Sequence, residues 1–136
     1  MLRAVENIQA GLSKRAAAGW DSGSIAASIV SVWRDIDVTL APIIGQRGVA
    51  ALFRRTLHLI RHDHPWLTAA LDSMADAMDF MALQSSLSQR TSANAVAANG
   101  ALLQKFLEQL ASLIGESLAE RLLRPVVDAH STGAHP

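Results

Sequence analysis

The sequence predicts an all-α fold, a mostly antiparallel bundle of five to six helices with an internal helix–break–helix duplication. Along most of the chain, apolar residues recur at steps of three and four, which is the spacing of a helix that buries one face. Half of the 136 residues are hydrophobic, many of them alanine, whereas 4% are aromatic. Alanine favours helix, and sheet proteins are normally richer in aromatic and β-branched residues.

A short recurrence indicates the duplication. Residues 40–47 read LAPIIGQR, and residues 110–117 read LASLIGES, seventy positions later. At the same offset, Arg54 falls on Arg124. Each copy reads as an apolar helix, a glycine break and a second helix. We therefore expect the two helix pairs to pack about an approximate twofold axis.

The first three helices are each expected to end at a glycine or a proline, because these residues do not continue a helix. They cover residues 2–18 before Gly19, residues 25–44 with Pro42 and Gly45 at the end, and residues 46–61 before Pro65. The second of these helices has the clearest apolar face, made by Ile25, Ile29, Val32, Ile36, Leu40 and Ile43.

The second half of the chain continues in the same way. Helical spacing predicts a helix over 66–84, whose apolar stripe is Leu67, Leu71, Met74, Met78 and Met81. The small polar residues 85–92 read as a loop that ends in an N-cap, Thr91 or Ser92. Helices are then expected over 93–114 and 116–127, separated by Gly115. We expect residues 1–127 to form one helical domain and residues 128–136 to be a disordered tail.

Composition argues against several classes of function. Twelve basic and twelve acidic residues give a formal net charge of zero, which disfavours nucleic-acid binding because that draws on a positive field. The absence of cysteine excludes disulfides, thiolate nucleophiles and cysteine-based metal sites. No uncharged apolar run reaches the roughly 20 residues of a membrane span, and the first residues lack the apolar core of a signal peptide. We therefore expect a cytoplasmic protein that does not enter a membrane.

A histidine cluster is the densest group of chemically active residues. His58 and His62 are four positions apart, and Asp63 and His64 follow directly. Imidazole binds zinc, iron and copper, so the cluster is a candidate metal site of unassigned metal. The alternative is a set of surface histidines at a helix C-terminus, where a protonated ring suits the helix dipole. No cofactor is predicted.

The same residues allow a third interpretation. Histidine phosphotransfer domains are four-helix bundles of about this size and carry His-x-x-Lys-Gly followed by a small residue. His58 resembles their phosphoacceptor, but Arg61 stands at the lysine position and His62 at the glycine position. The resemblance covers a handful of residues, and no family is identified from it.

Arginines spaced by seven residues form a stripe beside the histidines. A stripe of aspartates lies on the next expected helix, and the two helices are expected to pack as an antiparallel hairpin. The basic residues are Arg47, Arg54 and Arg61, and the acidic residues are Asp72, Asp76 and Asp79. One interpretation is a series of exposed ion pairs. The other is that Arg54 and Arg61 hold an anion such as a phosphate or a carboxylate.

Four further residues are candidates for a partner interface. Trp20 lies in an expected turn, where an exposed indole suits a protein contact. Trp33 lies beside the apolar stripe of its helix and suits either the core or a dimer seam. Met74 and Met78 suit an adaptable groove or an ordinary core.

No catalytic motif is found, so the leading expectation is a small non-enzymatic interaction or regulatory module in signalling. We expect it to self-associate as a dimer and to bind a protein partner, because several helices have wide apolar faces. Leu57 and Leu59 both fall outside the main stripe of their helix. The alternatives are a helical sensor for a small apolar ligand or metal, and the phosphotransfer-like domain.

Overall fold

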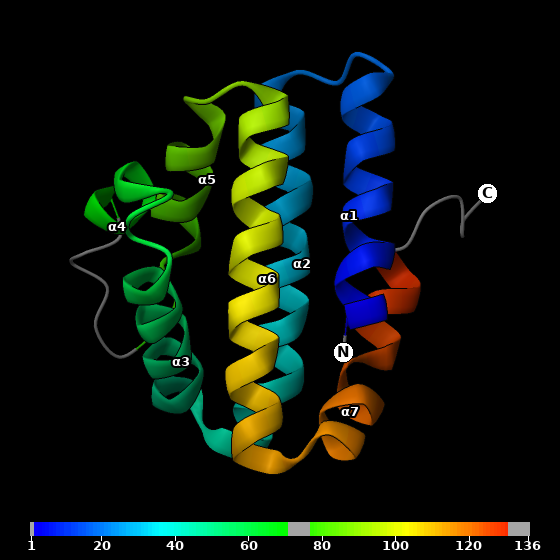
Figure 1. Ribbon diagram of the computed structural model, residues 1–136, viewed down its shortest axis with the longest axis vertical. Helices are drawn as coiled ribbons and strands as arrows, with labels where there is room; N and C mark the ends of the chain where they lie inside the picture. Colours follow the sequence, from blue (N-terminus) through cyan, green and yellow to red (C-terminus); the bar gives the residue numbers. More distant parts are fainter. Residues whose placement is uncertain (1, 71–76, 131–136) are drawn as a thin grey trace.

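The computed structural model describes residues 2–70 and 77–130, and this part of the chain is a bundle of seven α-helices without strands (Figure 1). The helices are α1 (Leu2–Ala17), α2 (Ser22–Ile44), α3 (Gln46–Leu59), α4 (Pro65–Ala70), α5 (Phe80–Ser88), α6 (Ser92–Ile114) and α7 (Glu116–His130). The predicted all-α class and bundle architecture are confirmed, with one more helix than expected.

The two longest helices, α2 and α6, lie side by side at the centre and run in the same direction (Figure 1). Short turns reverse the chain before each of them, so α1 and α5 run antiparallel to them. The pairing is crossed between the two halves of the chain. Helix α1 packs more extensively on α6 than on α2, and α5 packs mainly on α2. On the outside, α7 lies beside α1, and α3 lies on the opposite flank together with α4 and α5 (Figure 1).

The duplication extends to the backbone geometry at the ends of α2 and α6. Each helix has 23 residues and ends at a glycine with positive φ, +82° at Gly45 and +92° at Gly115. In each case the glycine N–H donates to a helix carbonyl at 2.8 Å, that of Ala41 or Ala111. Side chains with a Cβ rarely adopt this conformation, so glycine is required at both equivalent breaks.

Equivalent serines join the two halves at the opposite end of the bundle. The Ser22 hydroxyl donates to the Ser88 carbonyl at 3.1 Å. Seventy residues later, the Ser92 hydroxyl donates to the Trp20 carbonyl at 2.8 Å. Each bond ties the start of one long helix to the segment that leads into the other, with Ser88 at the end of α5 and Trp20 in the turn after α1. The approximate twofold relation therefore holds at both ends of α2 and α6.

The core is one cluster of buried apolar side chains between these helices. Trp33 is at its centre with no exposed surface. Its ring meets Phe53 of α3 and Phe106 of α6 edge to face, with ring centroids 4.9 and 5.1 Å apart. Edge-to-face pairs are a preferred aromatic arrangement, so the indole fixes α2, α3 and α6 together.

A buried polar network accompanies this aromatic cluster. The Trp33 indole Nε1–H donates to Asn99 Oδ1 at 2.8 Å, and Asn99 Nδ2 donates to Gln9 Oε1 at 3.0 Å. Gln9 Nε2 in turn donates to the Val96 carbonyl at 2.8 Å. Buried polar groups are costly unless they are paired, and here both Trp33 and Asn99 are paired.

The predicted helix over 66–84 is wrong in its continuity. Helix α4 is described as far as Ala70, and residues 71–76, which include Leu71 of the predicted stripe, lie outside the described residues. Residues 77–79 are not helical, and α5 begins at Phe80, where the Asp79 carboxylate caps it by accepting the Ala82 N–H at 3.0 Å. The helix then continues through the first half of the expected loop 85–92, to Ser88. It buries Leu83 and Leu87, and Met81 of the predicted stripe is 82% exposed.

Two helix ends differ from the prediction, whereas α2 ends at Ile44 as expected. Helix α3 ends at Leu59 instead of near residue 61. Helix α7 runs through Pro125 to His130, so the first three residues of the expected tail are helical. The His130 ring lies 2.7 Å from Asp35 Oδ2 of α2, which explains why this last turn stays on the bundle. Residues 131–136 lie outside the described residues.

Candidate functional site

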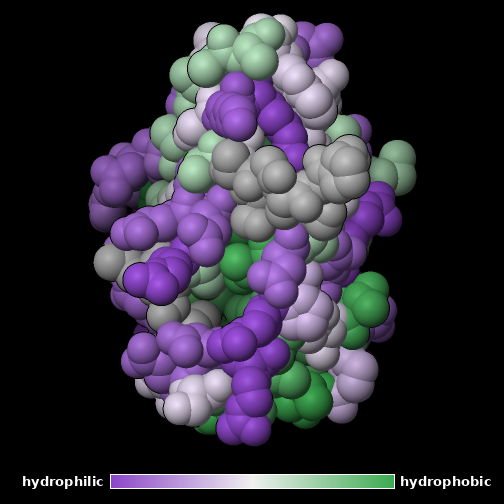
Figure 2. All heavy atoms as spheres, turned by 90° about the vertical axis from the view of Figure 1, so that its right-hand side faces the viewer, coloured by the Kyte–Doolittle hydropathy of each residue, from purple (hydrophilic) through white to green (hydrophobic). Residues whose placement is uncertain are grey.

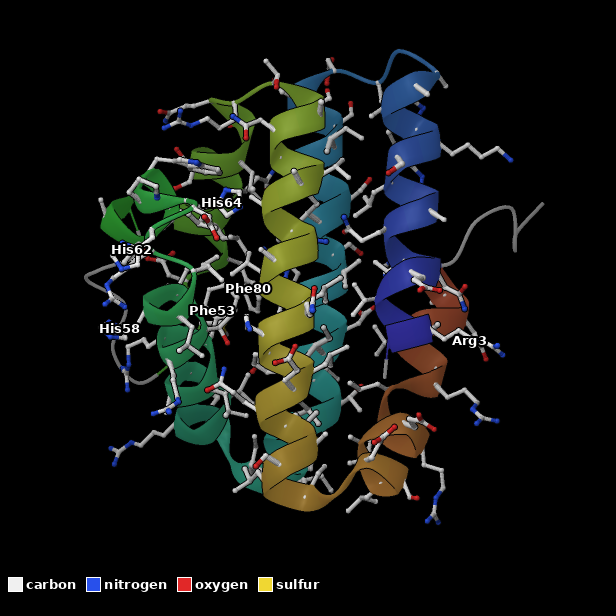
Figure 3. The ribbon with its side chains drawn as sticks, in the orientation of Figure 1. Arg3, Phe53, His58, His62, His64 and Phe80 are labelled. Carbon is white, nitrogen blue, oxygen red and sulfur yellow. The ribbon has the colours of Figure 1, made fainter. Side chains whose placement is uncertain are left out.

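The predicted histidine cluster lies on the outer side of α3 and the turn after it. His58 and His62 are exposed and lie at the edge of the bundle (Figure 3). Because α3 ends at Leu59, the two histidines are not stacked one helical turn apart on the same helix. The His64 ring lies edge to face with the Trp66 ring, and the two ring centroids are 6.3 Å apart. Within the described residues, no group of three His, Asp or Glu side chains is arranged to hold a metal ion.

Of the predicted charge ladder, the structure shows the contacts of Arg61 and Asp79. Arg61 Nη1 donates to the carbonyl of His58 at 2.6 Å, which closes the C-terminal turn of α3. Arg54 is exposed on α3. On the acidic side, Asp79 caps α5, while Asp72 and Asp76 lie outside the described residues. The anion site at Arg54 and Arg61 therefore stays a prediction.

The four interface candidates have different positions. Trp33 is a core residue with no exposed surface, so the expectation that it contributes to a partner surface does not fit its position. Trp20 is 44% exposed, and the Arg15 guanidinium lies 5.5 Å from its ring centroid. Met78 is half-buried against the core. Met74 lies outside the described residues.

Helix α3 also differs from the expected apolar face. Leu57 is buried in the core with 3% exposure, whereas Leu59 is 44% exposed. Phe53 points inward from the same helix toward the centre of the bundle (Figure 3). Of the two leucines that were expected to widen the apolar surface, one is therefore exposed.

A groove between α1 and α7 was not predicted. It has a volume of about 610 Å³ and is lined by Arg3, Ala4, Asn7, Glu120, Leu123, Arg124, Val127 and Asp128. Figure 2 faces this side of the molecule and shows a hollow with hydrophobic atoms at its floor and hydrophilic residues around it. The rim carries both positively and negatively charged side chains, so its charge favours neither an acidic nor a basic ligand.

A small apolar space adjoins this groove. It has a volume of about 10 Å³ and is lined by Ala4, Ile8, Ile36, Leu103, Leu107, Leu123, Val126 and Val127. A space of this size is at most large enough for a water molecule. A small apolar ligand enclosed between the helices therefore has no preformed chamber at this position.

The second surface feature is an apolar end of the bundle, where α2 and α6 finish. The apolar stripe of α2 is buried at Ile36 and Leu40 but emerges at Ile43, which is 52% exposed. The stripe of α6 is buried at Leu110 and emerges at Leu113, which is 61% exposed. Both core stripes thus extend one turn beyond the residues that cover them.

Three neighbouring residues complete this surface. Ile44 and Ile114 are half-buried beside the two exposed residues, and Leu118 in the first turn of α7 is 39% exposed. We refer to Ile43, Ile44, Leu113, Ile114 and Leu118 together as the apolar end. The sequence shows that both apolar stripes continue up to the glycine breaks, but it does not show which part of each stripe is left uncovered.

Asp37 is an isolated electrostatic feature near the core. Its Oδ1 atom is buried and has no hydrogen-bond partner, and burial raises the pKa of this carboxyl above 3.8. The equivalent residue in the second unit, seventy positions later, is Leu107, which is buried. Asp37 therefore occupies a position that an apolar side chain fills in the other half.

Comparisons with protein-family models, curated proteins and solved structures find no match to this chain. Within the part of the chain that the structure describes, no helix combines the length and apolar character needed to span a membrane.

Proposed function

We propose that this protein is a non-enzymatic interaction module that self-associates through the apolar end. The observation that carries the proposal is the exposure of Ile43 and Leu113, two equivalent members of buried core stripes. Apolar side chains grouped at one surface are commonly a site of protein association. A cytoplasmic regulatory role in signalling belongs to the same proposal, and the cysteine-free composition is in keeping with that location.

The geometry supports a second copy of the chain as the first partner to test. A symmetric dimer needs one surface that contacts itself. The apolar end has residues from both units of the approximate twofold, so it presents similar apolar side chains on both sides of that axis. A different protein partner would bind the α1–α7 groove, which is a separate surface with an apolar floor.

The test uses Leu113→Glu and a matched control, Val38→Glu. Leu113 lies in the apolar end, whereas Val38 is 72% exposed on α2, away from that end. Glutamate at position 38 reproduces the second unit, where Glu108 is the equivalent residue. Both substitutions introduce the same charge at an exposed position, so neither should prevent folding.

We expect native mass spectrometry and sedimentation to show a dimer of bare chain mass for the wild type and for Val38→Glu. In a dimer, Leu113→Glu removes an apolar contact from each copy and adds a charge. If the substitution costs about 1.4 kcal/mol of binding free energy in each copy, the dissociation constant of the dimer rises about a hundredfold. A wild type that is monomeric at all concentrations, or two variants that weaken the dimer equally, would contradict the proposal.

The second candidate is phosphotransfer through His58, which is favoured by the exposed position of this ring on α3. A phosphoacceptor histidine must be accessible to its donor protein. Incubation with a phosphorylated receiver domain should then give an acid-labile phosphohistidine that is lost in His58→Gln. If no such product forms, this candidate is eliminated, and the self-association proposal is unaffected.

A further inference from the structure

The two halves of the apolar end are equivalent in backbone but differ in their side chains. The first half comprises residues 43–48, at the junction of α2 and α3, and the second comprises residues 113–118, at the junction of α6 and α7. Figure 1 shows these two junctions at the same end of the bundle. Their differences decide how a second copy can be oriented on this surface.

The halves differ first in shape. Leu118 of the second half is 39% exposed, and its equivalent in the first half is Gly48, which has no side chain. A Cβ atom at Gly48 would lie 3.2 Å from the Cβ of Ile44, so Ile44 lies close over the glycine backbone. The second half therefore has an additional apolar side chain where the first half is reduced to backbone.

The halves also differ in charge. Arg47 of the first half is equivalent to Ser117, and Glu116 of the second half is equivalent to Gln46. The first half is therefore basic and the second acidic. Arg47 and Glu116 each also have an interaction within their own chain, and rim charges add little to affinity. Their main effect is to favour one orientation of the partner and to oppose the other.

A second copy that approaches end to end can be rotated in two ways. One rotation places like halves opposite each other, so Arg47 faces Arg47 and Leu118 faces Leu118. The other places the first half of each copy on the second half of its partner. That arrangement pairs opposite charges and sets Leu118 against the recess at Gly48, and a twofold axis repeats both contacts.

We infer that two copies of this chain join end to end with unlike halves facing, so that residues 43–48 of each copy contact residues 113–118 of the other. The inference rests on the self-association proposed above and specifies its orientation. Ile43 and Leu113 then cover each other across the interface, and both uncovered core stripes are buried.

Disulfide cross-linking tests the orientation, because the chain contains no cysteine and each introduced thiol is unique. The two variants are Arg47→Cys and Ser117→Cys, at equivalent and exposed positions. Each is oxidised alone and in an equimolar mixture, and the products are separated by mass. Circular dichroism of each variant verifies that it is folded.

With unlike halves facing, the mixture should give a mixed disulfide dimer at least about tenfold faster than either variant alone gives its own dimer. Dimers that cross-link through two like residues, or through neither pair, overturn the orientation and leave self-association standing. A protein that is monomeric by native mass spectrometry overturns both. The two failures are therefore distinguishable.

Discussion

Replacing Asn99 by leucine tests whether the buried network holds α2 and α6 in register. The substitution removes two hydrogen bonds, from Trp33 Nε1 at 2.8 Å and to Gln9 Oε1 at 3.0 Å. Because Trp33 has no exposed surface, its indole N–H is left without protein or water. A buried donor without a partner costs about 1–3 kcal/mol.

The other contributions are smaller. Gln9 is half-buried, so its freed oxygen can be hydrated. The equivalent residue in the first unit is Ile29, also fully buried, so the fold accepts an apolar side chain of this size at the equivalent position. We therefore expect Asn99→Leu to lower the free energy of unfolding by about 2 kcal/mol.

The assay is urea unfolding followed by circular dichroism, with a double-mutant cycle. Trp33→Phe also breaks the bond and additionally leaves a cavity, so it should cost more than Asn99→Leu. In the double variant, both the Trp33 indole N–H and the Asn99 amide are gone, so neither is left unpaired. The loss of unfolding free energy in the double variant should therefore be smaller than the sum of the two single losses by about 1–2 kcal/mol. Gln104→Leu, at an exposed position on α6, is the control. A stability unchanged in Asn99→Leu, or strict additivity, would refute the reasoning.

Two further predictions concern equivalent positions. Gly45→Ala and Gly115→Ala should each lower the free energy of unfolding by about 1–3 kcal/mol and by similar amounts, because a Cβ at either glycine meets nothing within 4 Å and only the positive φ is strained. Very unequal losses in urea unfolding would contradict the equivalence. Asp37→Leu should raise Tm at pH 7 by about 2–5 °C, since a partly buried unpaired carboxylate costs about 1 kcal/mol. Because the folded pKa is raised above 3.8, the penalty appears as pH rises through 3.8 and is absent below it. If the gain in Tm persists at pH 3, the buried carboxylate is not the cause of the gain.

The long helices and their breaks could be predicted because the signals are local. In α2 and α6 the apolar spacing, the glycine and the capping residue all lie within a few turns of one another. The recurrence around Gly45 and Gly115 also indicated the duplication, since similar sequences end both helices with similar backbone geometry.

Other features depend on residues far apart in the chain. The position of Trp33 in the core depends on Asn99, a hydrogen-bond partner 66 residues away. The start of α5 had a local signal, the Asp79 cap, but the methionine spacing dominated the prediction. The apolar end depends on which part of each stripe the other helices leave uncovered, and that is set by packing between distant segments.

The crossed packing also has a consequence for synthesis of the chain. Helix α1 is made first, but the surface on which it mainly packs, α6, begins at Ser92. A nascent chain that ends within α5 has no α6 to cover Ile8 and Leu12, both of which are buried in the finished protein. Since helices form locally and distant contacts must wait for the chain, the first half leaves the ribosome as helices without a finished core. Folding is then completed only when the second half emerges.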